Sequence, residues 1–84
     1  MENKTLKESA PLMLSENYKD RFKAEYMQLN NRFNGLNKML KDWDAGTLTF
    51  KPTCPKELYT YQLQSMKIYL DMLTIRATLE DIAL

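Results

Sequence analysis

Hydrophobic side chains recur every three or four residues through the first half of the chain, from Tyr18 to Trp43. This spacing places them on one face of an α-helix. It predicts a helix over about residues 16–43, roughly 42 Å long at 1.5 Å per residue. Ser15 is a typical residue for the N-cap, and Gly46 suits the left-handed conformation that ends many helices. The hydrophobic series consists of Tyr18, Phe22, Tyr26, Leu29, Phe33, Leu36, Leu40 and Trp43.

A second helix is predicted after a loop at about residues 44–54. It begins at about Pro55, because proline suits the first position of a helix, and it continues to about residue 83 without a further glycine or proline. Two long helices joined by a short loop predict an all-α fold, an antiparallel two-helix hairpin that forms one domain over residues 15–84. Residues 1–14 are largely polar, and we expect them to form a mobile tail with one helical turn at most, whose apolar end docks on a partner surface.

The second predicted helix carries two hydrophobic stripes, of which a hairpin can cover only one. An exposed stripe of this size is unusual on a monomer, so the pattern predicts self-association into a compact homo-oligomer. The first stripe consists of Tyr59, Leu63, Met66, Leu70, Leu73 and Ala77. The second consists of Tyr61, Ile68, Met72, Ile75, Leu79 and Ile82.

A line of polar residues separates these stripes: Gln62, Ser65, Tyr69, Arg76 and Glu80. One interpretation is an ion pair between Arg76 and Glu80, four residues apart, with the other members fixing the register of an oligomer. The other is a set of donors that face a bound anion or nucleobase, since arginine binds phosphate through two parallel hydrogen bonds. The pattern leaves both open.

The first predicted helix adds Tyr18, Arg21 and Arg32 as candidate binding residues. Residues 16–43 contain six basic and four acidic side chains, so their net charge is +2. Arg21 and Arg32 project beside the hydrophobic series, where they either extend along the helix edge to reach solvent or contact a ligand. Tyr18 is either a core residue with a solvated hydroxyl or a stacking surface for a base.

Composition removes several classes of function. The chain has no histidine and a single cysteine, Cys54, which excludes the usual zinc sites and histidine-based catalysis. We therefore expect a protein that is not an enzyme and has no cofactor or metal. A net charge of +1 and a long connecting loop argue against duplex nucleic acid as a partner. No apolar run is long enough for a membrane span, and one cysteine cannot form an internal disulfide, as is typical of cytosolic proteins.

Two motifs resemble those of a known family. The helix-one motif begins Arg21-Phe22-x-x-Glu25-Tyr26 and continues through Leu29, Arg32, Phe33, Leu36, Met39 and Leu40. The helix-two motif consists of Leu58, Gln62, Met66, Tyr69, Leu73 and Arg76. Together they resemble the small phage anti-CBASS proteins that act as cyclic-nucleotide sponges, and the hairpin is similar to the core of the Thoeris anti-defence sponge.

The resemblance implies a homohexamer in the cytoplasm of an infected bacterial host. It would bind cyclic di- or trinucleotides between protomers without cleaving them, and so block CBASS-like immune signalling. Arg76 matches the family's helix-two arginine, whereas Tyr18 and Arg32 are looser matches for its helix-one aromatic and basic positions. With Arg21, Gln62 and Tyr69 they complete the predicted ligand-binding set. The alternative is an oligomeric adaptor module without a small-molecule ligand. Neither reading indicates which cyclic nucleotide is preferred.

Overall fold

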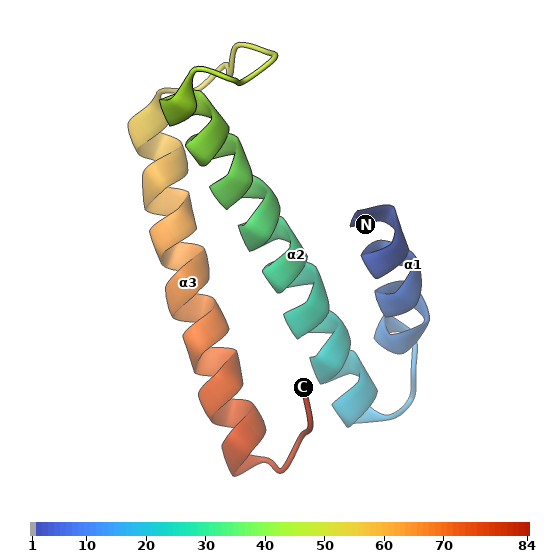
Figure 1. Ribbon diagram of the computed structural model, residues 1–84. Coiled ribbons are helices and arrows are strands. Elements are labelled where there is room, and N and C mark those ends of the chain that lie inside the picture. The colour runs from blue at the N-terminus through green and yellow to red at the C-terminus, as the bar shows by residue number, and fades with distance from the viewer. Residues whose placement is uncertain (1) are drawn as a thin grey trace.

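The computed structural model describes residues 2–84, with side chains from residue 6 onward, and the regular secondary structure in this range is all helical (Figure 1). The helices are α1 (Glu2–Met13), α2 (Tyr18–Ala45) and α3 (Lys56–Leu79). The prediction of an all-α fold is thus confirmed, but the described chain has three helices rather than a simple two-helix hairpin with a tail. No helix in this range is both long and apolar enough to span a membrane.

The ends of α2 are fixed by local hydrogen bonds. Its N-cap is Asn17, whose side chain accepts from the backbone N–H of Lys19 at 2.9 Å. The expectation that Ser15 caps the helix is wrong, because its hydroxyl donates instead to the Asp20 carboxylate at 2.8 Å. At the other end Gly46 has φ 74°. Its backbone N–H donates to the Trp43 carbonyl, and the N–H of Thr47 donates to the Asp42 carbonyl. These two bonds form a Schellman motif, so this glycine ends the helix as expected.

The end of α3 differs from the prediction. The helix stops at Leu79, although the sequence has no glycine or proline there. Asp81 takes the left-handed conformation with φ 58°, and the backbone N–H of Ile82 donates to the Ala77 carbonyl at 2.8 Å. This is again a Schellman motif. It turns the Ile82 side chain into the core, where it is only 7 % exposed, so the assignment of Ile82 to the exposed second stripe is wrong.

The core lies between α2 and α3, which run antiparallel (Figure 1). Its centre is Leu73, which is fully buried. Burial of such side chains is the main force that holds a helical hairpin together. The three buried residues of α3, which are Leu70, Leu73 and Ala77, all belong to the predicted first stripe. The central cluster consists of Phe22, Leu73, Ala77 and Ile82, with Tyr26 and Leu29 packed against it.

Helix α1 packs against the side of α2 opposite α3, and within the described residues it does not contact α3 (Figure 1). The expected mobile tail is therefore a folded helix. Its anchor is Ser9, which is fully buried and whose hydroxyl donates to the Leu6 carbonyl and accepts from the Gln28 side chain, both at 3.2 Å. A buried polar residue is tolerated when such hydrogen bonds satisfy it. Hydrophobic patterning does not reveal this contact because it is polar.

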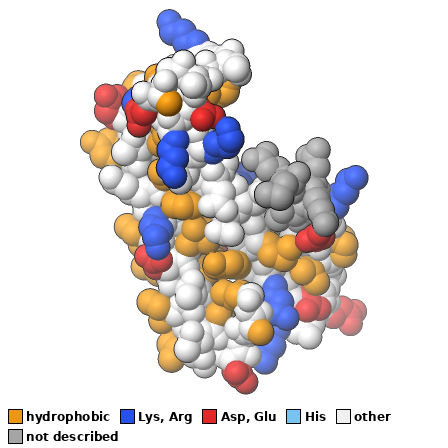
Figure 2. All heavy atoms as spheres, in the orientation of Figure 1, with side chains coloured by type: hydrophobic (Ala, Val, Ile, Leu, Met, Phe, Trp, Pro, Cys, Tyr) orange, Lys and Arg blue, Asp and Glu red, His pale blue; other side chains and the backbone are white. Residues whose placement is uncertain are grey.

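The side of α3 that faces away from α2 is hydrophobic and exposed. We call it the outer face of α3. Figure 2 shows hydrophobic side chains standing out along this helix. Leu79 is the most exposed, at 81 %. In a single chain, then, five of the six residues of the predicted second stripe lack cover. The outer face consists of Leu58, Tyr61, Ile68, Met72, Ile75 and Leu79.

Candidate functional site

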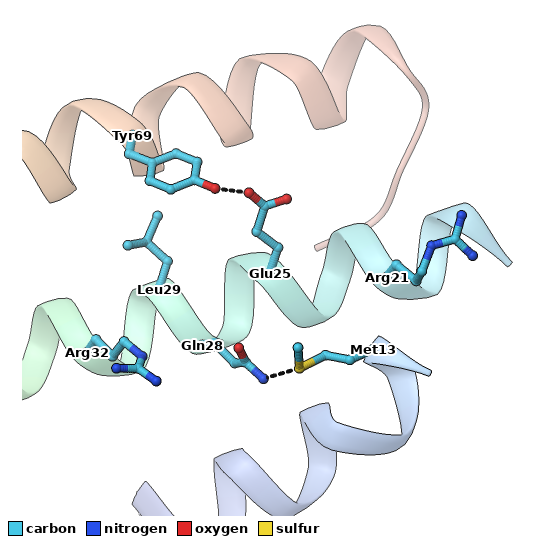
Figure 3. Close-up of a pocket in the computed structure, with 7 residues that line it drawn as sticks. All are labelled: Met13, Arg21, Glu25, Gln28, Leu29, Arg32 and Tyr69. Atoms are coloured by element: carbon cyan, nitrogen blue, oxygen red, sulfur yellow. Dashed lines mark hydrogen bonds between the residues drawn. The ribbon is translucent and has the colours of Figure 1, made fainter. Parts of the chain in front are cut away.

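A groove crosses the middle of the molecule where α2 lies between the other two helices (Figure 3). It has a volume of about 320 Å³, at the lower end of the roughly 300–1,000 Å³ that ligand pockets usually have. Side chains of α2 form its floor, Tyr69 of α3 stands on one side, and Met13 at the end of α1 stands on the other. The groove is lined by Met13, Arg21, Glu25, Gln28, Leu29, Arg32 and Tyr69.

Two arginines of α2 lie along this groove. Arg21 and Arg32 are separated by about 16 Å along the helix axis at 1.5 Å per residue. Arg21 donates through Nη1 to the backbone carbonyl of Ser15 at 2.7 Å, a neutral acceptor that leaves its charge uncompensated. None of the ion pairs among the described residues includes either arginine. Both positive charges are thus available to an anionic ligand.

The middle of the groove combines an aromatic ring with hydrogen-bonding groups. The Tyr69 hydroxyl donates to the Glu25 carboxylate, and the Tyr69 ring lies next to Leu29 (Figure 3). Tyr69 is 42 % exposed, so its ring can still stack with another planar group. Gln28 points the other way, toward α1, where its amide donates to Ser9 and Met13. The groove therefore offers positive charge, an apolar surface and a carboxylate together.

A second cluster joins the start of α2 to the end of α3. We call it the clasp, and it consists of Tyr18, Phe22, Arg76 and Glu80. The Tyr18 hydroxyl donates to Glu80 at 2.7 Å and accepts from Arg76 Nη2 at 2.8 Å. Arg76 Nε donates to Glu80 at 3.1 Å, and its guanidinium lies 5.0 Å from the centre of the Phe22 ring, a cation–π geometry.

The clasp shifts the pKa values of its members. The hydrogen bond to Glu80, followed by desolvation, raises the pKa of Tyr18 above its usual 10.0. The hydrogen bond from Tyr18 lowers the pKa of Glu80 below its usual 4.5, and Arg76 adds to this effect. The hydrogen bond to Glu80 raises the pKa of Arg76. All three shifts stabilise one arrangement: ionised Glu80, charged Arg76 and neutral Tyr18.

The six predicted ligand-binding residues fall into three places. Arg21, Arg32 and Tyr69 line the groove. Tyr18 and Arg76 lie in the clasp, and their assignment to a ligand stays a prediction, as it does for the others. Gln62 is exposed on α3 and lines neither cluster.

Four further groove residues are absent from the predicted set: Met13, Glu25, Gln28 and Leu29. A signal for two of them is present in the sequence. Arg21, Glu25, Gln28 and Arg32 follow one another at intervals of four, three and four residues, which places them along one face of a helix. Met13 could not be found this way, because it depends on the packing of α1.

The fold and the groove together define the class of protein. The protein is a small helical hairpin with an added N-terminal helix and a groove lined by two arginines that form no ion pair among the described residues. The family model Sequestin matches residues 16–79, most of the chain, and the chain belongs to the Sequestin family. The family's name indicates a sequestering, sponge-type protein, in agreement with the resemblance to the anti-CBASS sponges. It favours a binding role over a catalytic one.

The family match begins after α1, so that helix lies outside the matched region. No curated protein and no solved structure matches the chain.

Proposed function

We propose that this protein sequesters cyclic oligonucleotide second messengers, cyclic di- or trinucleotides, and holds them without cleavage. Its place of action is the cytoplasm of a phage-infected bacterium, where removal of the signal keeps CBASS-like immune effectors inactive. The observation that carries the proposal is the groove: two arginines without carboxylate partners flank an exposed tyrosine ring. Phosphates and a base need these two kinds of surface.

Membership of the Sequestin family supports the sequestering role. The proposal also includes self-association through the outer face of α3, with a hexamer as the assembly. A groove of about 320 Å³ is small for a whole cyclic oligonucleotide. In an assembly, surfaces of neighbouring copies would cover the part of the ligand that extends beyond the groove.

The size of the groove also favours a second candidate, a smaller cyclic signal of the ADP-ribose type. Such a ligand carries one adenine, two riboses and one pyrophosphate and is smaller than a cyclic dinucleotide, so it needs less surface beyond the groove of about 320 Å³. Both ligands demand the same chemistry of the groove, a base surface beside positive charge.

Calorimetry against a ligand panel tests the proposal. The panel contains cyclic di-GMP, cyclic di-AMP, cyclic GMP–AMP, cyclic tri-AMP and cyclic ADP-ribose. We expect tight binding of at least one member, and heating the complex should release it intact, as judged by mass spectrometry. A cleaved ligand would contradict sequestration. If no member binds at micromolar concentrations, the result favours the alternative hypothesis of an oligomeric adaptor module without a small-molecule ligand.

A further inference from the structure

Glu25 is out of place in a groove that binds only anions. It lies on the same face of α2 as Arg21 and Arg32, yet none of the ion pairs among the described residues includes it. Its carboxylate accepts from the Tyr69 hydroxyl instead. A carboxylate that faces the ligand space repels phosphate, but it can accept a further hydrogen bond from a donor group of a ligand.

The surroundings of Glu25 indicate which donor group that is. An ionised carboxylate only accepts hydrogen bonds. Tyr69 donates to Oε2, and no hydrogen bond among the residues whose side chains are described ends on Oε1, so this oxygen can accept from the ligand. The Tyr69 ring and Leu29 lie directly beside it (Figure 3). A base stacked on this apolar surface would bring its polar edge next to the carboxylate.

The bases differ at that edge. Adenine, guanine and cytosine each carry an exocyclic amine, which donates, whereas hypoxanthine carries a carbonyl at the position of the adenine amine. Carboxylates recognise such amines in other nucleic-acid complexes. A carbonyl in the same position would face the carboxylate oxygen, acceptor against acceptor.

We propose that Glu25 is the specificity-determining residue of the groove. It accepts a hydrogen bond from the exocyclic amine of the ligand's base while Arg21 and Arg32 bind the phosphates. The inference rests on the proposed function and deepens it: the ligand is a nucleotide whose base carries an exocyclic amine, as adenine, guanine and cytosine do. It also explains how the groove would reject inorganic polyanions such as pyrophosphate, which offer Glu25 no donor.

The test compares cyclic di-AMP with cyclic di-IMP by calorimetry, with cyclic ADP-ribose and its inosine analogue in parallel. We expect the wild-type protein to bind the adenine ligand at least about tenfold more tightly, the usual effect of one charge-assisted hydrogen bond. In Glu25→Gln the preference should fall below about threefold, because an amide both donates and accepts. The same variant should bind pyrophosphate several-fold more tightly, since a repulsive charge is gone.

Two further variants serve as controls. Glu16→Gln removes the same charge from an exposed position outside the groove and should change neither the preference nor pyrophosphate binding. Tyr69→Phe keeps the carboxylate and the ring, so the adenine preference should survive in it. Circular dichroism establishes that each variant is folded.

The outcomes separate the inference from the proposed function. Equal binding of adenine and hypoxanthine ligands by the wild-type protein, or an unchanged preference in Glu25→Gln, overturns the inference and leaves sequestration standing. Failure of every nucleotide to bind the wild-type protein overturns the proposed function, and the inference with it.

Discussion

Arginine side chains in this protein occupy two different electrostatic environments. In the clasp, the charge of Arg76 is compensated by Glu80 at 3.1 Å and its guanidinium lies over Phe22. In the groove, Arg21 and Arg32 have no carboxylate partner among the described residues. Binding of an anion is stronger where the positive charge is not already neutralised. We therefore expect the groove arginines to contribute more to ligand affinity than Arg76 does.

The first prediction concerns Arg32. Its replacement by alanine should weaken binding of the best panel ligand by roughly ten- to hundredfold, the usual effect of losing a hydrogen bond to a charged group. The side chain is exposed, so the free energy of unfolding should change little. Calorimetry and urea denaturation measure the two effects.

Lys41→Ala provides the matched control for Arg32→Ala. It removes one positive charge from another exposed position of α2, outside the groove. Equal losses of affinity in both variants would mean that net charge matters and the groove does not.

The second prediction concerns the pH dependence of the clasp. The pKa of Glu80 is lowered in the folded protein, so its contribution to stability is present above its usual pKa of 4.5 and is lost as the pH falls through the folded value. The pKa of Tyr18 is raised, so its contribution is present below 10.0 and is lost as the pH rises through the folded value. The effects should be modest and sensitive to salt, because the groups are partly exposed.

Glu80→Gln tests the acid side of this window. At neutral pH the variant should be less stable than the wild-type protein in urea denaturation. As the pH falls below 4.5, the difference should shrink, because protonated Glu80 no longer attracts Arg76. A difference that is the same at pH 7 and at low pH would show that the charge of Glu80 has no role in stability.

At the scale of the elements, the helix ends decide how the hairpin closes. α2 ends at Gly46 with φ 74°, a conformation that costs other residues about 1–2 kcal/mol. A Cβ added there would meet no atom within 4 Å, so the backbone alone sets the penalty. Gly46→Ala should therefore lower the free energy of unfolding by about 1 kcal/mol.

Gly46→Asn separates this backbone effect from the addition of a side chain. Asparagine accepts the left-handed conformation more readily than alanine does, so the loss in urea denaturation should be smaller. If alanine and asparagine destabilise equally, the left-handed conformation at Gly46 is not the cause.

The same elements show what the sequence can predict. The periodic series of α2 predicts an amphipathic helix because its signal repeats over many turns. The end of α3 was predicted wrongly because Asp81, rather than a glycine, takes the left-handed position. α1 was missed because its buried anchor is a serine satisfied by Gln28. Both features depend on contacts between elements, which hydrophobic periodicity does not encode.

The residues of the candidate site also fall into those that the sequence indicates and those that only helix packing reveals. Spacing along α2 brings Arg21 and Arg32 to one face, so they could be selected from the sequence. The roles of Glu25 and Met13 depend on which helices stand on either side of α2. The contact of Tyr69 with Glu25 likewise depends on the pairing of α2 with α3. The sequence thus indicates charged candidates, whereas the packing of three helices determines which of them share a groove.

At the scale of the whole molecule, the outer face of α3 remains without cover in a single chain. Ile75 is 61 % exposed and Met72 is 58 % exposed, and hydrophobic faces of this extent usually mark an interface. The groove borders this face, since Tyr69 of the groove directly follows Ile68 of the outer face along α3. Association through the outer face would bring further surface to the ligand.

The last prediction follows from this arrangement. The wild-type protein should sediment as an assembly well above its chain mass of 9.9 kDa. The double variant Ile68→Glu, Ile75→Glu should shift toward the monomer at micromolar concentrations, because assembly would bury its new charges. Gln64→Glu adds a charge on the polar side of α3, outside the outer face, and should leave the assembly intact. We expect ligand affinity to fall together with assembly in the double variant, because the groove alone is small for a cyclic oligonucleotide. A wild-type monomer would contradict self-association, and full affinity in a monomeric variant would show that the groove of one chain suffices.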